Sequence, residues 1–256
     1  MTTSGTTDTD QQDTPAAAAD PGRPLAGRSV LLAGASGGLG AQLARRLADA
    51  GAALTVTARS RDGLDALGLD ATVVPADLRD PAGAAAAVDA AVQAHGGLDG
   101  VVFAAGVVAF GPGTEVDDAV LQELFDITVF APVRLLRAAA PALTRAADAG
   151  RQPFVANVSA VTAEAPTAGM AAYSAAKAAL TAFDGAVSRE LRTTGIRVLD
   201  IRPPHTNTGL ASRPIAGTAP KLPAGHDPGA VADRIVAALV DGDRDLPASA
   251  FGPAPR

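Results

Sequence analysis

The chain has 256 residues, 48% of them apolar, and a formal net charge of −6, which suits one large α/β domain with a sizeable core. It contains no cysteine, and this excludes disulfides, thiolate metal sites and thiol nucleophiles. The acidic balance argues against nucleic acid as a partner, and the three dispersed histidines predict no metal site.

Residues 1–24 are mostly Thr, Asp, Gln, Ala and Pro, with almost nothing large and apolar. Such a segment cannot offset the entropy lost on ordering, so we expect a disordered tail ahead of one domain over residues 25–256. The tail lacks the basic start and apolar run of a signal peptide, and no later segment has about 18 uncharged apolar residues in succession. We therefore expect a cytoplasmic protein with no membrane partner.

From Leu25 onward, short β-branched runs alternate with longer Ala/Leu-rich stretches. This alternation predicts a three-layer, doubly wound α/β fold around a mainly parallel sheet of about seven strands. The expected strands are Ser29–Ala33, Leu54–Thr57, Thr72–Ala76, Gly100–Ala104, Phe154–Val158, Arg197–Ile201 and, less clearly marked, Asp245–Ala248. The first expected helix, Leu39–Ala50, should turn Arg45 and Arg46 to the outside and end at Gly51.

A glycine-rich turn joins the first strand to the first helix and reads Ala33-Gly34-Ala35-Ser36-Gly37-Gly38-Leu39-Gly40. Free backbone N–H groups and the helix dipole favour a pyrophosphate there. Gly34, Gly38 and Gly40 allow the tight turn and the close approach that a dinucleotide needs. The alternative is a glycine-rich turn without a ligand, but the position in a βαβ unit favours the dinucleotide.

The end of the second strand indicates which dinucleotide is bound. An acidic residue at this point would bind the ribose hydroxyls of NAD and repel the extra phosphate of NADP. Here Ala58 is followed by Arg59 and Ser60, which offer a guanidinium and a hydroxyl to a 2′-phosphate. We expect NADP(H) to be preferred over NAD(H), with a solvated arginine at a strand end as the alternative.

Tyr173 and Lys177 are four residues apart, a spacing that places both side chains on one face of a helix. The chain has one tyrosine and two lysines, so a coincidental pair at this spacing is improbable. A nearby ammonium should lower a phenol pKa that is otherwise about 10, and a phenol tuned in this way can exchange a proton with a carbonyl oxygen. A surface pair without function is the alternative.

These two motifs resemble the short-chain dehydrogenase/reductase family, and the resemblance extends over roughly Leu25 to Phe251. It implies a Rossmann fold and an NADP(H)-dependent oxidoreductase that interconverts a carbonyl and an alcohol, with Tyr173 as proton donor or acceptor. It also implies a homodimer or homotetramer. The cofactor-binding residues that it implies are Gly34, Ser36, Gly38, Leu39, Gly40, Arg59, Ser60, Asp77, Leu78, Ala105, Gly106, Tyr173, Lys177, Pro203, Thr206 and Thr208.

The chain departs from the family's pattern at several positions. Ala33 replaces the threonine of the turn, and Phe103 and Ala104 replace two asparagines. Ala160 replaces the serine that holds the substrate oxygen, and Thr128 replaces the helix asparagine that supports a water-mediated proton route to the lysine. Alternation along an extended chain points Ser159 away from Ala160 and points Thr162 the same way as Ala160, unless the chain bulges. Thr162 and Ser159 are therefore competing substitutes for the serine.

Residues 209–227 are long for a plain connection and predict a lid over the substrate. With Val107, Val108, Phe110 and Met170 they predict a mainly apolar pocket for a small carbonyl or alcohol, unless these residues only pack the lid down. His205 beside the lid is a candidate substrate contact or a surface histidine. The departures leave two other functions open: an NADP-binding sensor or interaction protein, and a non-redox enzyme such as a dehydratase or cyclase.

Overall fold

The structure is a computed structural model that describes residues 23–253. Its strands are β1 (Ser29–Ala33), β2 (Ala53–Ala58), β3 (Thr72–Pro75), β4 (Gly100–Phe103), β5 (Phe154–Val158), β6 (Arg197–Ile201) and β7 (Asp245–Leu246). Its helices are α1 (Gly38–Asp49), α2 (Arg61–Asp65), α3 (Pro81–His95), α4 (Asp118–Phe125), α5 (Ala131–Asp148), α6 (Ala171–Glu190) and α7 (Pro228–Asp241). Short turns of π or 3-10 helix are η1 (Asp126–Phe130), η2 (Val161–Ala163) and η3 (Ala248–Phe251).

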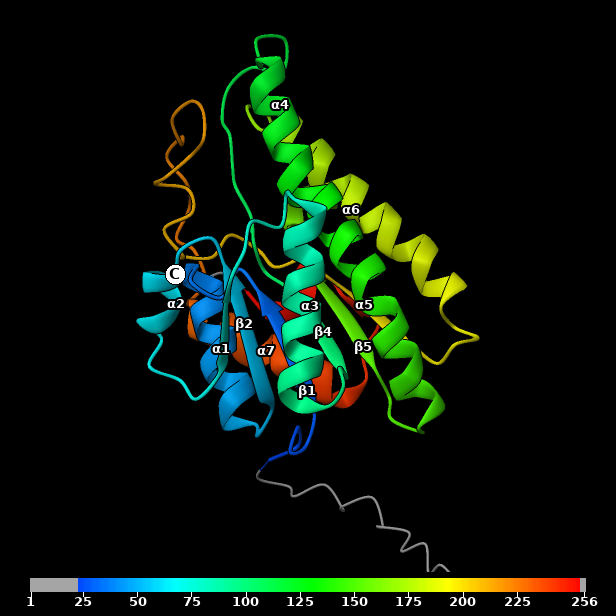
Figure 1. Ribbon diagram of the computed structural model, residues 1–256. Helices are drawn as coiled ribbons and strands as arrows, with labels where there is room; N and C mark the ends of the chain where they lie inside the picture. Colours follow the sequence, from blue (N-terminus) through cyan, green and yellow to red (C-terminus); the bar gives the residue numbers. More distant parts are fainter. Residues whose placement is uncertain (1–22, 254–256) are drawn as a thin grey trace, which may run out of the picture.

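The strands form one seven-stranded sheet in the order β3-β2-β1-β4-β5-β6-β7, and every neighbouring pair is parallel. This confirms the doubly wound Rossmann fold, with helices on both faces of the sheet (Figure 1). The last strand is shorter than expected, because η3 begins at Ala248. The strand order reverses between β1 and β4, which is where open α/β sheets bind their ligands.

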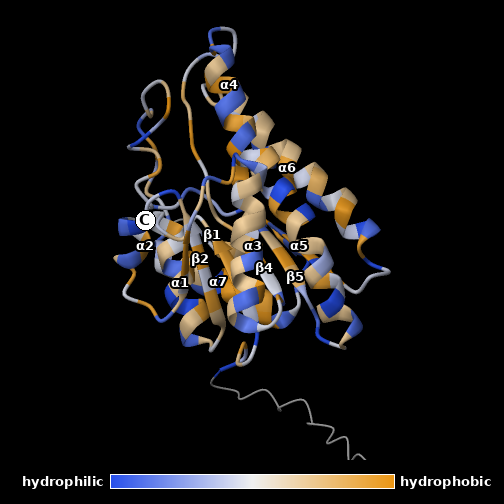
Figure 2. Cartoon of the chain, viewed as in Figure 1, coloured by the Kyte–Doolittle hydropathy of each residue, from blue (hydrophilic) through white to orange (hydrophobic). Residues whose placement is uncertain are grey.

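Alternation along the strands separates two apolar cores. Val30 and Leu32 of β1 pack with α1 and α7, whereas Leu31 and Ala33 pack with α3 and α5. Strands covered on both faces need apolar residues at consecutive positions, and Figure 2 shows mainly hydrophobic strands in the middle layer, whereas the helices around them also carry hydrophilic residues.

Local signals set the ends of the helices. Asp80 and Asp227 cap α3 and α7, because their carboxylates accept hydrogen bonds from the backbone N–H groups of Ala82 and Ala230, both at 2.9 Å. A proline follows each cap, where its missing N–H costs nothing. Both helices end at a glycine in the left-handed conformation, as the αL C-cap requires.

Helix α1 follows its expectation apart from one side chain. It begins one residue early and ends before Gly51. Arg45 is exposed, but Arg46 is half-buried against α7, where it forms an ion pair with Asp233. The expectation that both arginines point outward is therefore wrong for Arg46, since a second helix covers that side of α1.

Helices α4 and α5 form one continuous rod that is interrupted by the π segment η1. A π segment inserts an extra residue into the helical hydrogen-bond ladder and occurs often at functional sites. Here it places the Thr128 side chain in the interior. The rod rises beside α6 above the upper edge of the sheet (Figure 1).

The expected lid is tied to the segment after β4 by backbone hydrogen bonds. The N–H of Ile215 donates to the carbonyl of Val108 at 2.9 Å, and the N–H of Phe110 donates to the carbonyl of Ala216 at 3.0 Å. Gly217 has φ +70, and a Cβ there would lie 1.9 Å from the Phe110 carbonyl oxygen, so only glycine fits.

The expected tail falls mainly outside the described residues, which begin at 23. Arg23, which we assigned to the tail, lies against Gly51: its Nε is 3.0 Å from where a Cβ of that glycine would stand. Within residues 23–253, no helix is long and apolar enough to cross a membrane, and no group of acidic residues and histidines could hold a metal ion.

Candidate active site

The carboxyl ends of the parallel strands bring together the segments that the sequence singled out. The glycine turn follows β1, Arg59 and Ser60 follow β2, and Asp77 follows β3 shortly after Pro75. Ala105 and Gly106 follow β4, Ser159 follows β5, and Pro203 follows β6. Because all these strands run in one direction, their ends share one edge of the sheet.

The glycine turn is built so that nothing but glycine fits at three positions. A Cβ on Gly34 would lie 2.4 Å from the amide nitrogen of Ala105, on Gly38 2.4 Å from the carbonyl oxygen of Thr208, and on Gly40 2.0 Å from the carbonyl oxygen of Gly34. Helix α1 begins here with no side-chain cap and no acidic residue in its first turn. Such an uncapped N-terminus has free N–H groups, which fits a diphosphate.

Next to this turn, two serines and an arginine border the end of β2. The Ser36 side chain lies 3.1 Å from where a Cβ of Gly63 would stand, and the Ser60 hydroxyl accepts a hydrogen bond from the N–H of Gly63 at 3.3 Å. Arg59 is exposed, and its charge helps to lower the pKa of Asp77. This donor set fits a phosphate group better than a free ribose diol.

Asp77, the expected adenine contact, is held by a residue that sequence reasoning missed. The Arg79 guanidinium donates to both carboxylate oxygens, at 3.0 and 2.6 Å. These hydrogen bonds are the main reason why the pKa of Asp77 lies below its usual value. Leu78 between them is buried. An arginine two residues after an acid was the available sequence signal.

The remaining expected cofactor contacts border the same edge. Phe103, which stands where the family has an asparagine, is completely buried. The Pro203 carbonyl accepts a hydrogen bond from the N–H of Val161 at 2.9 Å, and the Thr206 hydroxyl donates to the Pro204 carbonyl at 2.8 Å. The Thr208 backbone lies against Gly38, so the segment after β6 closes over the glycine turn.

Tyr173 and Lys177 lie on α6 in the interior, with exposed fractions of 7% and 4%. The Lys177 ammonium is 5.8 Å from the centre of the tyrosine ring and donates to the Val158 carbonyl at 2.9 Å. A Cβ on Gly106 would lie 4.0 Å from the same ammonium. Tyr173 and Lys177 are therefore buried at the edge of the sheet where the strands end.

Burial is the main cause that moves the pKa values of Tyr173 and Lys177 from their usual range. It raises the pKa of Tyr173 to about 12 and lowers the pKa of Lys177 to about 8, against an opposing effect of Asp200. The expected lowering of the phenol pKa by Lys177 is not found in this arrangement, because burial is the cause that sets the pKa of Tyr173 and it disfavours the phenolate. At neutral pH Tyr173 carries its proton and Lys177 its charge.

The two candidate substitutes for the missing serine differ in what their hydroxyls contact. Ser159 is buried and donates to the Lys177 carbonyl at 3.0 Å, so its proton is already used in a hydrogen bond. Ala160 packs in an apolar cluster with Tyr173 and Phe110. Thr162 is buried in η2, and its hydroxyl has no hydrogen-bond partner within the described residues.

Thr128 also has a buried hydroxyl without a partner within residues 23–253. It lies in η1, which packs against α6. A buried, unpaired hydroxyl costs free energy unless water or a ligand satisfies it. Thr128 and Thr162 are therefore positions where an additional polar atom would be stabilised, and Ser159 is not.

A cavity of about 300 Å³ opens beside this cluster, between the lid, the segment after β4 and the start of α6. Its apolar lining includes Phe110, Val116, Val120 and Met170. Phe110 and Met170 also pack in the cluster that contains Tyr173. Of the expected pocket residues, Phe110 and Met170 thus line the cavity, whereas Val107 and Val108 only pack in the cluster beside it.

The profile of the short chain dehydrogenase family matches residues 28–216. The chain is similar to the 1-deoxy-11-beta-hydroxypentalenate dehydrogenase of Streptomyces avermitilis, with 34% identity over 193 residues, which cover 71% of this chain and 70% of that protein.

The fold is similar to many solved structures. A 3-ketoacyl-(acyl-carrier-protein) reductase from Brucella melitensis complexed with NADH superposes with a TM-score of 0.80 at 25% identity, covering 89% of this chain and 99% of that one. A metagenomic short-chain oxidoreductase in complex with NADP gives a TM-score of 0.73 at 30% identity, with coverages of 88% and 97%.

Proposed function

The chain belongs to the short-chain dehydrogenase family, and on that premise we propose that it is an NADP(H)-dependent reductase of apolar ketones or aldehydes, with Tyr173 as the proton donor. The observation that carries the proposal is the buried Tyr173–Lys177 pair, which lies beside Gly106 at the strand edge that also carries the glycine turn. This one edge supports both a dinucleotide and a proton-transferring phenol.

The protonation of Tyr173 favours the reductive direction. Burial raises its pKa to about 12, so at neutral pH the phenol is a donor to a carbonyl oxygen. A bound nicotinamide would supply the hydride. The Lys177 ammonium is available to the ribose hydroxyls, and its charge favours the phenolate that remains after the proton has left.

We assign the substrate-oxygen contact to Thr162. Its hydroxyl is buried without a partner within the described residues, while that of Ser159 is occupied by the Lys177 carbonyl. Thr162→Val keeps the shape of the side chain, and it should lower kcat/KM for carbonyl reduction by about 10²-fold, as loss of one oxyanion donor does. Ser29→Ala is the control in a kinetic assay with saturating NADPH, because the Ser29 hydroxyl is likewise buried without a partner within the described residues but lies at the start of β1, at the other end of the sheet. A Thr162→Val enzyme as active as the Ser29→Ala enzyme would refute the assignment.

We base the preference for NADPH on Arg59, Ser36 and Ser60, because the solved relatives include a complex with NADH as well as complexes with NADP. Arg59→Asp should reverse the preference, because a carboxylate repels the 2′-phosphate and accepts the ribose hydroxyls of NADH. The ratio of the NADPH and NADH dissociation constants is the measurement. Arg61→Asp is the control, because Arg61 pairs with Asp65. An unchanged ratio in Arg59→Asp contradicts the role of Arg59.

The cavity beside the lid supports a mainly apolar substrate. Its volume of about 300 Å³ suits a small compound, and Phe110, Val116, Val120 and Met170 give it an apolar wall beside the acidic Glu115 and Asp117. A hydrophobic carbonyl compound would gain from burial against that wall. The lid is held to the segment after β4 by two backbone hydrogen bonds, and we propose that these break when substrate enters.

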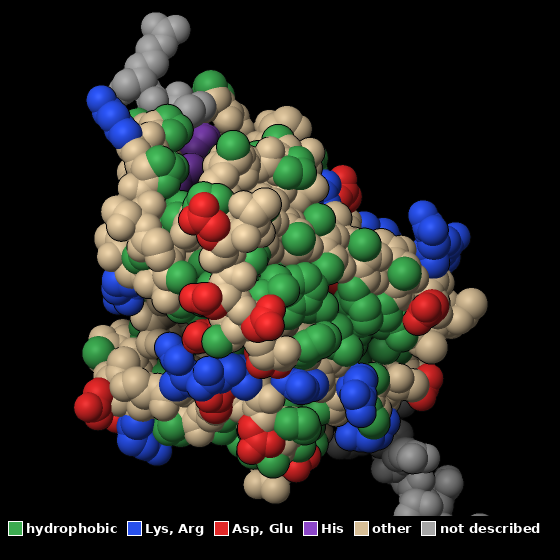
Figure 3. Space-filling view, turned by 90° about the horizontal axis from the view of Figure 1, so that it is seen from above, with side chains coloured by type: hydrophobic (Ala, Val, Ile, Leu, Met, Phe, Trp, Pro, Cys, Tyr) green, Lys and Arg blue, Asp and Glu red, His purple; other side chains and the backbone are tan. Residues whose placement is uncertain are grey.

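We also propose a homodimer or homotetramer. Phe130, the last residue of η1, is 41% exposed, and Leu121 of α4 is 37% exposed. Seen from the upper end, apolar side chains gather in a broad patch bordered by charged ones (Figure 3). Contiguous apolar surface of this kind marks interaction sites, and sedimentation analysis tests the assembly.

A catalytically reduced NADP-binding sensor is the second candidate, favoured by Ala160 and Thr128 in place of the usual polar residues. A non-redox dehydratase or cyclase would use the same Tyr173–Lys177 pair for proton transfer alone. Tight NADPH binding with no turnover of any carbonyl supports the sensor. Turnover that leaves NADPH unconsumed supports the non-redox enzyme.

A further inference from the structure

A row of polar side chains crosses the end of the sheet beneath α6. Asn157 of β5 pairs in register with Asp200 of β6, and Asp200 pairs with Asp245 of β7. On the neighbouring strand β4, the same row continues with the buried Phe103. The row therefore changes from apolar to polar where α6 covers it, and buried polar groups at such a place need partners.

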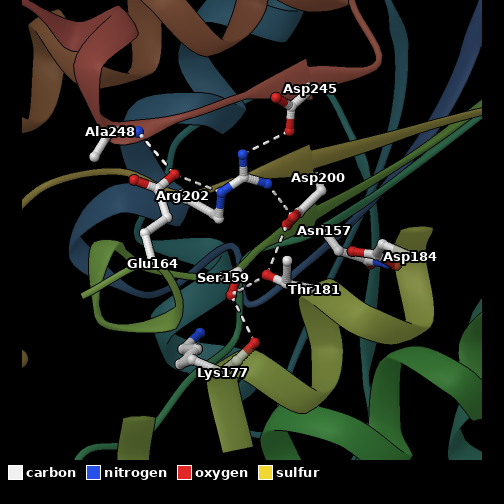
Figure 4. A network of polar contacts seen from close by, with 10 residues as sticks. All are labelled: Asn157, Ser159, Glu164, Lys177, Thr181, Asp184, Asp200, Arg202, Asp245 and Ala248. Carbon is white, nitrogen blue, oxygen red and sulfur yellow. Dashed lines mark hydrogen bonds and ion pairs between the residues drawn. The ribbon is translucent and has the colours of Figure 1, made fainter. Parts of the chain in front are cut away.

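Hydrogen bonds connect this row to the turn of α6 that carries Lys177 (Figure 4). The Ser159 hydroxyl donates to the Lys177 carbonyl at 3.0 Å. The Thr181 hydroxyl lies 3.2 Å from the Ser159 hydroxyl and 3.3 Å from a carboxylate oxygen of Asp200. Thr181 has one proton, and an ionised carboxylate is the stronger acceptor.

Arg202 holds Asp200 in place from the other side. Its guanidinium contacts Asp200, and it also bonds Glu164 at 2.5 Å and Asp245 at 2.6 Å. Burial raises the pKa of Asp200, whereas the charge and hydrogen bond of Arg202 and the hydrogen bond of Thr181 lower it. These contacts favour a charged carboxylate at a position that is only 6% exposed.

Among residues 23–253, no carboxylate is bonded to the Lys177 ammonium. Its hydrogen bond goes to the Val158 carbonyl, and Asp200 is the group whose charge raises the pKa of Lys177 against burial. The adjacent Asp184 contributes no charge at neutral pH, because burial raises its pKa to about 8. The ionisable groups facing Lys177 are thus Tyr173 on α6 and Asp200 on β6, with Asp184 and Arg202 behind Asp200.

We propose that Asp200, oriented by Thr181 and Arg202, is a positioning residue that keeps the buried Lys177 charged and its helical turn fixed. The role rests on the proposed function, since it matters to catalysis only if Lys177 serves a cofactor and Tyr173. This role gives the polar row beneath α6 a function, because its groups act on Lys177 through space and through the Ser159–Thr181 contacts.

The direct test is the titration of Lys177 in the protein without added cofactor. The chain has two lysines, Lys177 and Lys221, so protein labelled with ¹⁵N at Nζ and ¹³C at Cε gives two side-chain signals, assigned with Lys221→Arg. Asp200→Asn should move the Lys177 midpoint below its starting value of about 8 and leave Lys221 unchanged. A fall of about one unit would reduce the charged fraction at pH 8 from about a half to about a tenth.

Asp184→Asn is the comparison variant, because it replaces a neighbouring buried acid whose charge is not among the causes that set the pKa of Lys177, and it keeps an acceptor for Asn157. It should move the Lys177 midpoint less than Asp200→Asn does. If Asp200→Asn does not fold, Thr181→Val and Asp200→Glu replace it. Thr181→Val should lower the midpoint, and Asp200→Glu should keep it near the original value. An unchanged midpoint in Asp200→Asn, or in Thr181→Val where the first fails to fold, overturns the proposal.

A second readout separates a purely structural role from this one. The affinity for NADPH should fall at a lower pH in Asp200→Asn than in the original protein, whereas loss of packing alone would weaken binding equally at every pH. Failure of the proposed function can be told apart from failure of the proposed role of Asp200, because a protein that reduces no carbonyl compound would still show the expected titration of Lys177. A uniform loss of affinity together with an unmoved titration would assign Asp200 to stability alone.

Discussion

Replacing Tyr173 with Phe should reduce kcat/KM for NADPH-dependent carbonyl reduction by about 10²- to 10⁴-fold, the range expected for loss of a general acid. The phenyl ring can keep the apolar contacts that the tyrosine makes with Leu124 and Ala176, so the fold should persist. The affinity for NADPH should stay within about a factor of three, since the ring is retained. Steady-state kinetics with a panel of apolar carbonyl compounds measures the loss.

Ser174→Ala is the control for Tyr173→Phe, because it removes a different buried hydroxyl from the same turn of α6. Ser174 accepts a hydrogen bond from the N–H of Thr167 at 3.4 Å, so its loss should cost little activity. A Tyr173→Phe enzyme as active as the Ser174→Ala enzyme would exclude Tyr173 as the proton donor. A Tyr173→Phe enzyme that loses NADPH binding instead would assign the tyrosine to the cofactor site alone.

Gly34→Ala should lower the free energy of unfolding by about 2–5 kcal/mol, the sum of a left-handed backbone cost and a steric cost. Gly34 has φ +81, and a Cβ there would lie 2.4 Å from the Ala105 amide nitrogen. The substitution therefore strains the turn and pushes β1 away from the end of β4. Denaturant unfolding measures the loss.

Gly68→Ala isolates the backbone part of this effect. Gly68 has φ +63, and nothing lies within 4 Å of where its Cβ would stand, so the loss should be only about 1–2 kcal/mol. The excess in Gly34→Ala then measures the clash with Ala105. Equal losses in the two variants would show that the glycine turn does not press against β4.

Most of the fold could be predicted from the periodicity of apolar residues and from the turn residues of the sequence. Ser29–Ala33 and Phe154–Val158 are apolar runs bounded by turn residues, and the structure has the same bounds. The strand at Asp245 is shorter than expected because Leu246 is followed by a proline and then by η3. A run of Pro, Ala and Ser gave no signal that separates an edge strand from a 3-10 turn.

Contacts between distant residues could not be derived in this way. Arg46 forms an ion pair with Asp233, and Arg202 forms ion pairs with Glu164 and Asp245. These ion pairs depend on which helices and strands become neighbours in the fold. The π segment at Thr128 had no sequence signature that we recognised. Asp200 and Thr181 were missed for the same reason, since neither belongs to a local motif.

The titration of Tyr173 depends on the three-dimensional structure most strongly. Spacing alone indicated that Lys177 shares its helix face, and the structure confirms this. The balance between charge and burial follows only from the surroundings, and burial raises the pKa of Tyr173 to about 12. The sequence therefore predicted the pair, and the structure shows that the phenol keeps its proton at neutral pH, as the proposed role of proton donor requires.

The most direct test of the proposed function is hydride transfer from NADPH deuterated at the nicotinamide C4 to apolar ketones and aldehydes, followed by mass spectrometry of the products. The proposed function predicts an alcohol with deuterium on the former carbonyl carbon, formed by the native protein and lost in Tyr173→Phe. NADPH that binds tightly but transfers no deuterium to any compound of the panel would contradict it.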